Sequence, residues 1–187
     1  MQPVVLRTPR LTLAAPTEAD IEAIYQACQD PEIPRWTTVP SPYARSDAED
    51  FVAKTAEWWL ADSEYTWAIH HEGMLAGVIG MYRMVRAGSG EIGFWMSPSS
   101  RGKGILTEAA RAVIDFGFSD AVSLKRIEWR AVVGNIASAK TARGLGFQFE
   151  GMLRQALASP RGRDDGWVAG LLSSDDRAPK AWPVLED

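Results

Sequence analysis

The sequence predicts a single α/β domain, because segments with a period-two apolar pattern alternate with segments that have the spacing of amphipathic helices. The chain has 187 residues, a usual length for one domain and enough to bury a sizeable core. No internal repeat or linker divides it. We therefore expect one domain over residues 1–172, followed by a polar tail over residues 173–187.

The N-terminal segment is predicted to form a strand and then a helix. Residues 10–14 alternate between polar and apolar side chains, as in a half-buried strand. Thr17 is a typical N-cap residue, and apolar residues recur after it at helical spacing as far as Cys28. We therefore expect Cys28 to lie in the core and not to act as a nucleophile.

Residues 30–45 are rich in proline and are predicted to form a loop. Loops of this length are often functional, so Trp36 and Tyr43 are candidates for lining an acceptor pocket. The alternative is that both aromatic rings cover an edge of the core. A capping box from Ser46 to Glu49 predicts a second helix, which runs to Leu60.

The two histidines of the chain lie next to each other between two predicted strands, residues 65–70 and 74–83. Adjacent strand residues point to opposite faces of a sheet, so His70 and His71 suit neither a metal site nor a catalytic pair. The pattern favours a hairpin tip. The remaining elements are predicted as strands over residues 91–96, 126–132, 147–153 and 167–172 and helices over residues 105–118 and 138–145.

A glycine-rich basic loop precedes the helix that begins at Ile105. Gly102 and Gly104 have no Cβ to hold a ligand away from the backbone, and Arg101 and Lys103 add positive charge. Free amide groups at the N-terminus of a helix bind phosphate-type anions. The loop therefore predicts a pyrophosphate site, with an ordinary strand-to-helix turn as the alternative.

Composition excludes several classes of protein. The net charge of −4 and the pI of about 5.3 give no overall field that attracts nucleic acid. The N-terminus lacks the apolar region of a signal peptide, and no apolar run is long enough to span a bilayer. Cys28 is the single cysteine, so no internal disulfide forms, and no Cys/His cluster predicts a metal site. We expect a cytoplasmic protein without a metal, acting as a monomer or homodimer.

Three motifs occur in an order that resembles the GNAT superfamily of acyl-CoA-dependent N-acetyltransferases. They are Glu91-Ile92-Gly93-Phe94 before the loop, Thr107-Glu108-Ala109 at the helix start, and Asn135-x-x-Ser138 followed by Leu145-Gly146-Phe147-x-x-x-Gly151. The sequence is most similar to the RimJ/RimL group of ribosomal-protein N-terminal acetyltransferases. The resemblance extends from about Leu6 to about Leu172.

The resemblance implies a mixed, strongly twisted sheet of about six to seven strands, flanked by about four helices. In this family the fourth and fifth strands splay apart, and the pantetheine arm of acetyl-CoA enters the gap. Here those strands are residues 91–96 and 126–132. The implied cofactor-binding residues are Phe94, Trp95 and Met96 for pantetheine, Arg101, Gly102, Lys103, Gly104, Ile105 and Leu106 for pyrophosphate, Asn135 and Ser138 along the thioester, and Lys140 and Arg143 at the outer phosphate.

The sequence departs from the wider family at the expected general acid. Many members carry a tyrosine seven residues after the asparagine, and this chain has Ala142 there. Ser138 lies one helical turn earlier on the same face, so its hydroxyl can approach the thioester sulfur. The RimJ/RimL group is similar in using a serine, which makes the departure consistent with that group.

The implied reaction is direct attack of a neutral amine on the acetyl thioester. It requires a polarised carbonyl, a stabilised thiolate and a base for the amine proton. We assign these roles to the Met96 amide, Ser138 and Glu91. For Glu91 the alternative is a strand carboxylate that faces solvent or pairs with a neighbouring arginine. Glu108 is interpreted as structural, because a first-turn carboxylate favours the helix dipole.

An enzyme without an evident strong base is better matched to an α-amine than to a lysine side chain. Their pKa values, about 7.8 and about 10.4, differ by about 3.5 kcal/mol of deprotonation free energy. The expected acceptor is therefore a protein or peptide N-terminus, a free amino acid or a small amine.

Two other functions fit parts of the sequence. A non-catalytic acyl-CoA-binding module is favoured by the missing tyrosine but disfavoured by Asn135 and Ser138. A nucleotide-binding protein with another fold is disfavoured because Thr107 stands where a dinucleotide fingerprint needs a third glycine.

Overall fold

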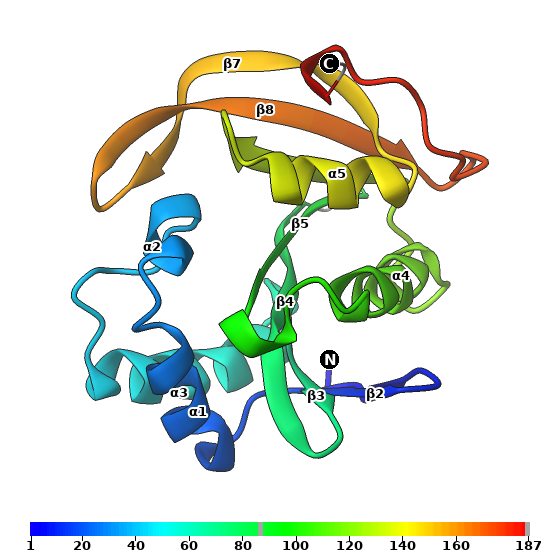
Figure 1. Cartoon of the computed structure of the whole chain (residues 1–187). Coiled ribbons are helices and arrows are strands. Elements are labelled where there is room, and N and C mark those ends of the chain that lie inside the picture. The colour runs from blue at the N-terminus through cyan, green and yellow to red at the C-terminus, as the bar shows by residue number, and fades with distance from the viewer. Residues whose placement is uncertain (86–87, 186–187) are drawn as a thin grey trace.

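A computed structural model describes residues 1–85 and 88–185, which fold around one mixed sheet (Figure 1). The strands of the described residues are β1 (Leu6–Arg7), β2 (Leu11–Ala14), β3 (Tyr65–His71), β4 (Met74–Val85), β5 (Ser89–Met96), β6 (Arg126–Val132), β7 (Gln148–Ser159) and β8 (Gly162–Leu172). The α-helices are α1 (Ile21–Ala27), α2 (Glu32–Trp36), α3 (Arg45–Leu60), α4 (Ile105–Phe118) and α5 (Ile136–Gly144). Short 3₁₀ turns occupy Glu18–Asp20, Pro98–Ser100 and Pro183–Leu185.

The strand order is β1-β2-β3-β4-β5-β6-β8-β7, which confirms the α/β class and the mixed sheet. Every neighbouring pair is antiparallel except β5 and β6. A parallel pair needs a crossover, and α4 supplies it. The sheet has one or two strands more than the sequence predicted, because β1 is only two residues long.

Strands β5 and β6 pair only over their first four residues, from Ser89 with Arg126 to Ile92 with Trp129. Beyond this point β5 continues along β4, and β6 continues along β8. The two strands therefore part in the middle of the sheet, as the resemblance implied. The gap opens at the C-terminal end of β5, where the glycine-rich loop follows.

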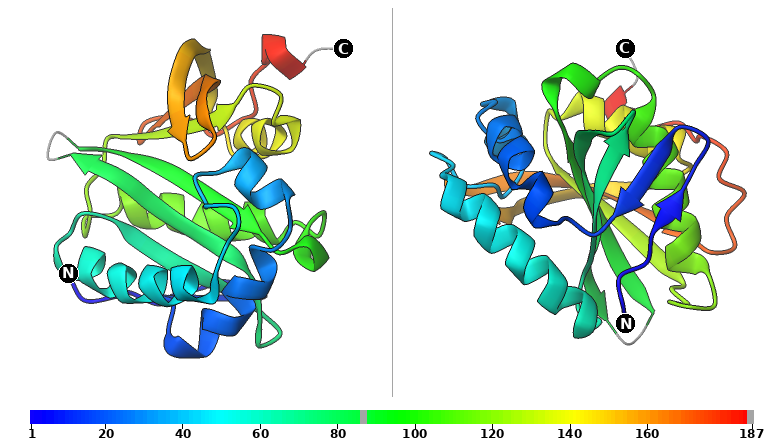
Figure 2. Two further views of the ribbon diagram at one scale, coloured as in Figure 1. Left: turned by 90° about the vertical axis from the view of Figure 1, so that its left-hand side faces the viewer. Right: turned by 90° about the horizontal axis from the view of Figure 1, so that it is seen from below.

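Helices cover both faces of the central strands (Figure 2). Helix α4 buries Ile105, Val113 and Ile114 in the main core, against apolar side chains of β4, β5 and β6. On the other face, α1 and α3 enclose a smaller apolar cluster that includes Ile24 and Cys28. Burial raises the pKa of the Cys28 thiol to about 12, so the thiolate needed of a nucleophile is disfavoured. The assignment of Cys28 to the core is confirmed.

Three local predictions were wrong. Residues 30–45 contain the helix α2, not only loop. Helix α3 begins at Arg45, because the Asp47 carboxylate accepts from the Ala44 amide at 2.7 Å, so the predicted Ser46 box is displaced. The last two strands form a hairpin that is longer than predicted, and Figure 1 shows it arching over α2 and α5.

The C-terminal segment from Ser173 to Leu185 returns to the body of the protein, and Glu186 and Asp187 lie outside the described residues. Trp182 in this segment is fully buried. Its indole N–H donates to the Phe147 carbonyl at 3.0 Å, and its ring packs on Trp129. The tail is therefore anchored in the core by one large side chain.

His70 forms a partly buried polar contact with Asp20, which precedes α1. The distance from His70 Nε2 to Asp20 Oδ1 is 2.7 Å. The hydrogen bond from Asp20 raises the pKa of His70 above its usual value, although burial lowers it. Burial raises the pKa of Asp20, but its bonds to His70 and Thr17 outweigh this and lower it. The contact joins α1 to the sheet.

This pair predicts a pH dependence of stability. Because the folded-state pKa of His70 is raised, its contribution is full below pH 6.5 and is lost as pH rises through the folded-state value. The Asp20→Asn variant is expected to lose about 1 kcal/mol at pH 6 and less at pH 9. Urea unfolding at both pH values measures this, and an equal loss at both would contradict it.

Candidate active site

A cleft of about 1110 Å³ opens where β5 and β6 part. Residues 93–96 of β5 and 129–132 of β6 form its two walls, and the glycine-rich loop and α5 close one end. Helices α2 and α3 contribute its opposite side. A cleft of this size at a break in a sheet accommodates a ligand as large as a nucleotide-linked thioester.

The main chain of β5 presents unpaired polar groups to this cleft. Ser97 donates its amide to the Ala76 carbonyl at 2.9 Å, and β5 continues with Met96 opposite Gly77. Antiparallel partners alternate between hydrogen-bonded and open pairs, so the amides of Met96 and Phe94 point away from β4 and toward the gap. By the same alternation the main chain of Trp95 faces β4, which leaves only its side chain for a ligand.

The loop before α4 has the geometry of an anion site. Gly102 and Gly104 adopt φ values of 73° and 72°, which favour glycine, and Gly104 is the N-cap of α4. The first helical amides, from Ile105 onward, have no partner within the helix. A Cβ at Gly102 would meet nothing within 4 Å, so the space above the loop is open. The loop therefore has the shape that the predicted pyrophosphate site requires, and the pyrophosphate role itself stays a prediction.

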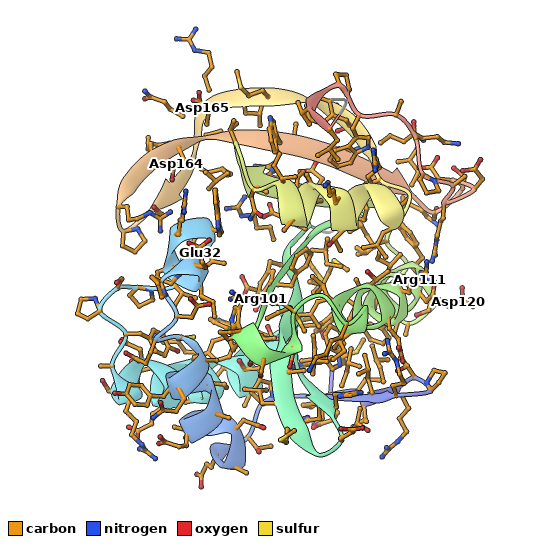
Figure 3. All side chains as sticks on the ribbon, viewed as in Figure 1. Glu32, Arg101, Arg111, Asp120, Asp164 and Asp165 are labelled. Atoms are coloured by element: carbon orange, nitrogen blue, oxygen red, sulfur yellow. The ribbon has the colours of Figure 1, made fainter. Side chains whose placement is uncertain are left out.

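The Arg101 side chain does not point freely into the predicted pyrophosphate site. Its guanidinium donates to Asp30 Oδ2 at 2.5 Å and to the Met96 carbonyl at 3.0 Å, near the centre of Figure 3. The charge is thus partly neutralised, and the side chain ties the end of β5 to the loop after α1. The Arg101 amide donates to the Pro98 carbonyl at 3.4 Å, so Arg101 serves mainly to hold the loop.

Glu108 has the structural environment that its position in the helix predicts. Its carboxylate accepts from the Thr8 hydroxyl at 2.5 Å and from Arg10 Nε at 2.7 Å. Although partial burial raises the pKa of Glu108, these bonds lower it below its usual value. Arg10 also donates to the Lys103 carbonyl at 3.2 Å, so this network holds the loop in place.

Ser138 and Asn135 meet at the start of α5. Asn135 is the N-cap, and its side-chain oxygen accepts the Ser138 amide at 3.2 Å. The Ser138 hydroxyl oxygen accepts from the indole N–H of Trp129 at 3.0 Å. Both Asn135 and Ser138 line the cleft, as the sequence predicted. Ala142, in contrast, is buried in the core and supplies no polar group.

Glu91 lines the cleft and is largely shielded from solvent. Its carboxylate accepts from Arg83 at 2.9 Å and lies 3.5 Å from Arg130 Nε. Burial raises the pKa of Glu91 above its usual value, against the opposing charges of the two arginines. The expected ion pair is therefore present, and the same carboxylate stays within the cleft.

Trp36 and Tyr43 both line the cleft on the side of α2 and α3. Tyr43 is also packed against the small core around Cys28, and Trp36 donates to Glu32 at 2.9 Å. Glu32 of α2 and Asp164 of β8, both labelled in Figure 3, also line the cleft on this side, which forms its mouth. Arg161 of the β7–β8 turn donates to the Thr37 carbonyl at 3.4 Å and bridges this mouth.

Sequence reasoning selected some residues that the fold does not bring to the cleft and missed others. Lys103, Lys140 and Arg143 are not among the described residues that line it, so their role at the phosphates stays a prediction. Thr141, one turn after Ser138, lines it instead. Trp129 and Asp30 were also missed. A side chain that acts through a partner distant in sequence leaves no local signal.

Two findings concern metals and membranes. Over residues 1–85 and 88–185, no group of three or more His, Cys, Asp or Glu side chains is placed to hold a metal ion. None of the helices in these ranges is long and apolar enough to cross a membrane.

Comparison with known proteins agrees with this geometry. The family described as acetyltransferase (GNAT) domain matches residues 10–148. The probable N-acetyltransferase YjcK of Bacillus subtilis is 30% identical over 119 residues, which cover 62% of this chain and 65% of YjcK. The ribosomal-protein-serine acetyltransferase of Escherichia coli is 35% identical over 89 residues, 47% of this chain and 49% of that protein. Mycobacterium smegmatis RimJ, solved with CoA-disulfide, superposes with a TM-score of 0.82 at 21% identity, covering 92% of this chain and 90% of RimJ.

The fold and the cleft define an acyl-CoA-dependent transferase. The chain belongs to the GNAT acetyltransferase family, because the family match spans most of its length. It is an N-acetyltransferase whose co-substrate is acetyl-CoA, and the similarity to RimJ and RimL proteins predicted from the sequence is confirmed.

The open space above Gly102 predicts a specific effect of a methyl group there. Gly102→Ala is expected to weaken acetyl-CoA binding at least tenfold, because the Cβ occupies space that the pyrophosphate needs. Gly73→Ala in the β3–β4 turn is a matched control, since Gly73 has a φ of 79° and an equally open Cβ position. Both variants carry about 1 kcal/mol of backbone strain. Calorimetric titration with acetyl-CoA measures the affinities of the two variants, and equal affinities would contradict a pyrophosphate site at this loop.

Proposed function

We propose that the protein acetylates amines with a pKa close to that of an α-amine, such as a peptide or protein N-terminus or a small amine. The observation that carries the proposal is the state of Glu91. Burial raises the pKa of Glu91, but the charges of Arg83 and Arg130 oppose that rise, so the carboxylate is a weak base for a lysine ammonium with a pKa of about 10.4. An α-amine is already about one-tenth neutral at pH 7.

The acceptor enters the cleft from the side of Trp36 and Tyr43, opposite the glycine-rich loop. Glu32 and Asp164 at this mouth are paired with Arg35 at 3.3 Å and Arg161 at 3.5 Å, so they give no preference for a cationic acceptor. The relatives include an enzyme named for a ribosomal-protein serine, which supports a protein N-terminus as one acceptor. We also propose that the enzyme is cytoplasmic and is active as a monomer or homodimer.

The reaction proceeds by direct transfer. The amine nitrogen attacks the thioester carbon, the C–N bond forms, and the C–S bond breaks with sulfur leaving as thiolate. The Met96 amide, which points into the gap, stabilises the developing oxyanion. The Ser138 hydroxyl donates a hydrogen bond to the thiolate, and the amine proton passes to Glu91 directly or through water.

Ser138→Ala tests the stabilisation of the leaving group. We expect kcat to fall about 100-fold, the lower end of the range for such groups, with the affinity for acetyl-CoA nearly unchanged. Release of free thiol under saturating acetyl-CoA measures kcat. An unchanged kcat would remove Ser138 from the mechanism.

Glu91→Gln tests the base, with Glu128→Gln as the matched control. Glu128 lies opposite Glu91 on β6, and its carboxylate accepts from Arg130 at 2.8 Å. We expect Glu91→Gln to lower kcat/KM about tenfold or more for an α-amine. The pKa of Glu91 is raised, so Glu91 is protonated at a higher pH than an exposed carboxyl would be. The wild-type rate is therefore expected to begin its fall on acidification at that higher pH. A similar loss in both variants would assign Glu91 to the ion pair alone.

An acceptor screen tests the substrate class. The screen compares acetyl-CoA-dependent thiol release with four kinds of acceptor. These are peptides with free N-termini, amino acids, small amines, and peptides whose N-terminus is acetylated so that a lysine side chain is the free amine. Comparable turnover of lysine side chains and α-amines would contradict the α-amine preference. Binding of acetyl-CoA without turnover of any amine would instead indicate an acyl-CoA-binding module.

A further inference from the structure

Trp129 occupies the position where the cleft begins. It pairs with Ile92 in the last bridge between β5 and β6, and its side chain is 1% exposed. Its indole N–H donates to the Ser138 hydroxyl oxygen at 3.0 Å, across nine residues of sequence. The contact joins the wall of the cleft to the serine at its end.

This hydrogen bond restricts where the serine proton can point. A hydroxyl has one proton to donate, and an indole N–H can only donate, so Ser138 accepts from Trp129 and keeps its proton for another partner. A helical serine commonly gives that proton to the carbonyl four residues earlier, as Thr141 does here with Ala137 at 3.0 Å. Among the hydrogen bonds of the described residues, the Ser138 hydroxyl donates none. The proton is available to the cleft.

Trp129 is itself held by the C-terminal tail. The ring centroids of Trp129 and Trp182 are 5.4 Å apart, and the Phe149 ring packs on Trp182 with its centroid 5.5 Å away. Trp182 is fixed in turn by its hydrogen bond to the Phe147 carbonyl at 3.0 Å. Packing of this density limits the rotation of the Trp129 ring and so fixes the direction of its N–H.

We propose that Trp129 is a positioning residue, supported by Trp182 of the tail, that orients and polarises the Ser138 hydroxyl toward the departing thiolate. A donated hydrogen bond makes the hydroxyl a better donor in its turn. The proposal rests on the proposed role of Ser138. It makes the segment from Ser173 to Leu185 part of the active-site structure, through Trp182.

Trp129→Phe removes the N–H and keeps most of the ring. We expect kcat to fall about fivefold, the change that corresponds to one neutral hydrogen bond, while KM for acetyl-CoA changes less than twofold. Trp59→Phe is the matched control, because buried Trp59 also donates a 3.0 Å indole hydrogen bond, to the Thr66 carbonyl. That variant is expected to lose stability without loss of kcat.

A double-mutant cycle separates positioning from structure. In the Ser138→Ala background, Trp129→Phe has no hydroxyl to orient, so we expect no further loss of kcat. An equal loss of kcat in both backgrounds, or no loss in either, overturns the proposal. If Ser138→Ala alone leaves kcat unchanged, the role of Ser138 fails and the positioning role of Trp129 fails with it. That result differs from equal losses in both backgrounds, which would reject the role of Trp129 alone.

Trp182→Leu tests the contribution of the tail. A smaller side chain frees the Trp129 ring, so we expect kcat to fall severalfold in the wild type and not in the Ser138→Ala background. Thermal unfolding of both proteins confirms that they are folded at the assay temperature. A loss of the same size in both backgrounds would assign Trp182 to stability alone.

Discussion

The divergence of β5 from β6 after Ile92 and Trp129 is the constraint on which the site depends. Each strand keeps its other neighbour, so the sheet opens without losing the antiparallel pairs on either side. Unpaired main-chain groups inside a protein are unfavourable, and at this gap they remain available for a ligand. A substrate arm with amide groups of its own can complete the interrupted sheet.

We propose that recognition of the co-substrate depends more on backbone than on side chains. The amides of Phe94 and Met96 and the first turn of α4 face the cleft, while the Arg101 guanidinium is taken up by Asp30 and the Met96 carbonyl. Side chains serve mainly to hold this backbone. The network of Thr8, Arg10 and Glu108 fixes the loop from one side, and Arg101 fixes it from the other.

Local sequence signals predicted the elements well where the pattern was regular. Helix α4 has the predicted bounds, Ile105–Phe118, because the glycine-rich loop marks its start. Helix α5 begins at Ile136, two residues before the predicted start, because Asn135 caps it. The same reasoning failed at Ser46, because the acid at the start of α3 is Asp47, which accepts the Ala44 amide three residues earlier. The predicted end of β7 was also too early. Part of this hairpin extends beyond the core, so its exposed residues lack the apolar alternation that indicates a strand.

The sequence by itself determined the α/β class, the anion loop and the pair Asn135 and Ser138, because each depends on residues close together in the chain. Only the tertiary structure decided the environment of Glu91 and the use of the Arg101 charge, since their partners lie on other elements. It also decided that Trp182 of the tail reaches Trp129 and that Trp129 reaches Ser138. Trp129 and Trp182 are 53 positions apart, and only the closed fold brings their rings into contact.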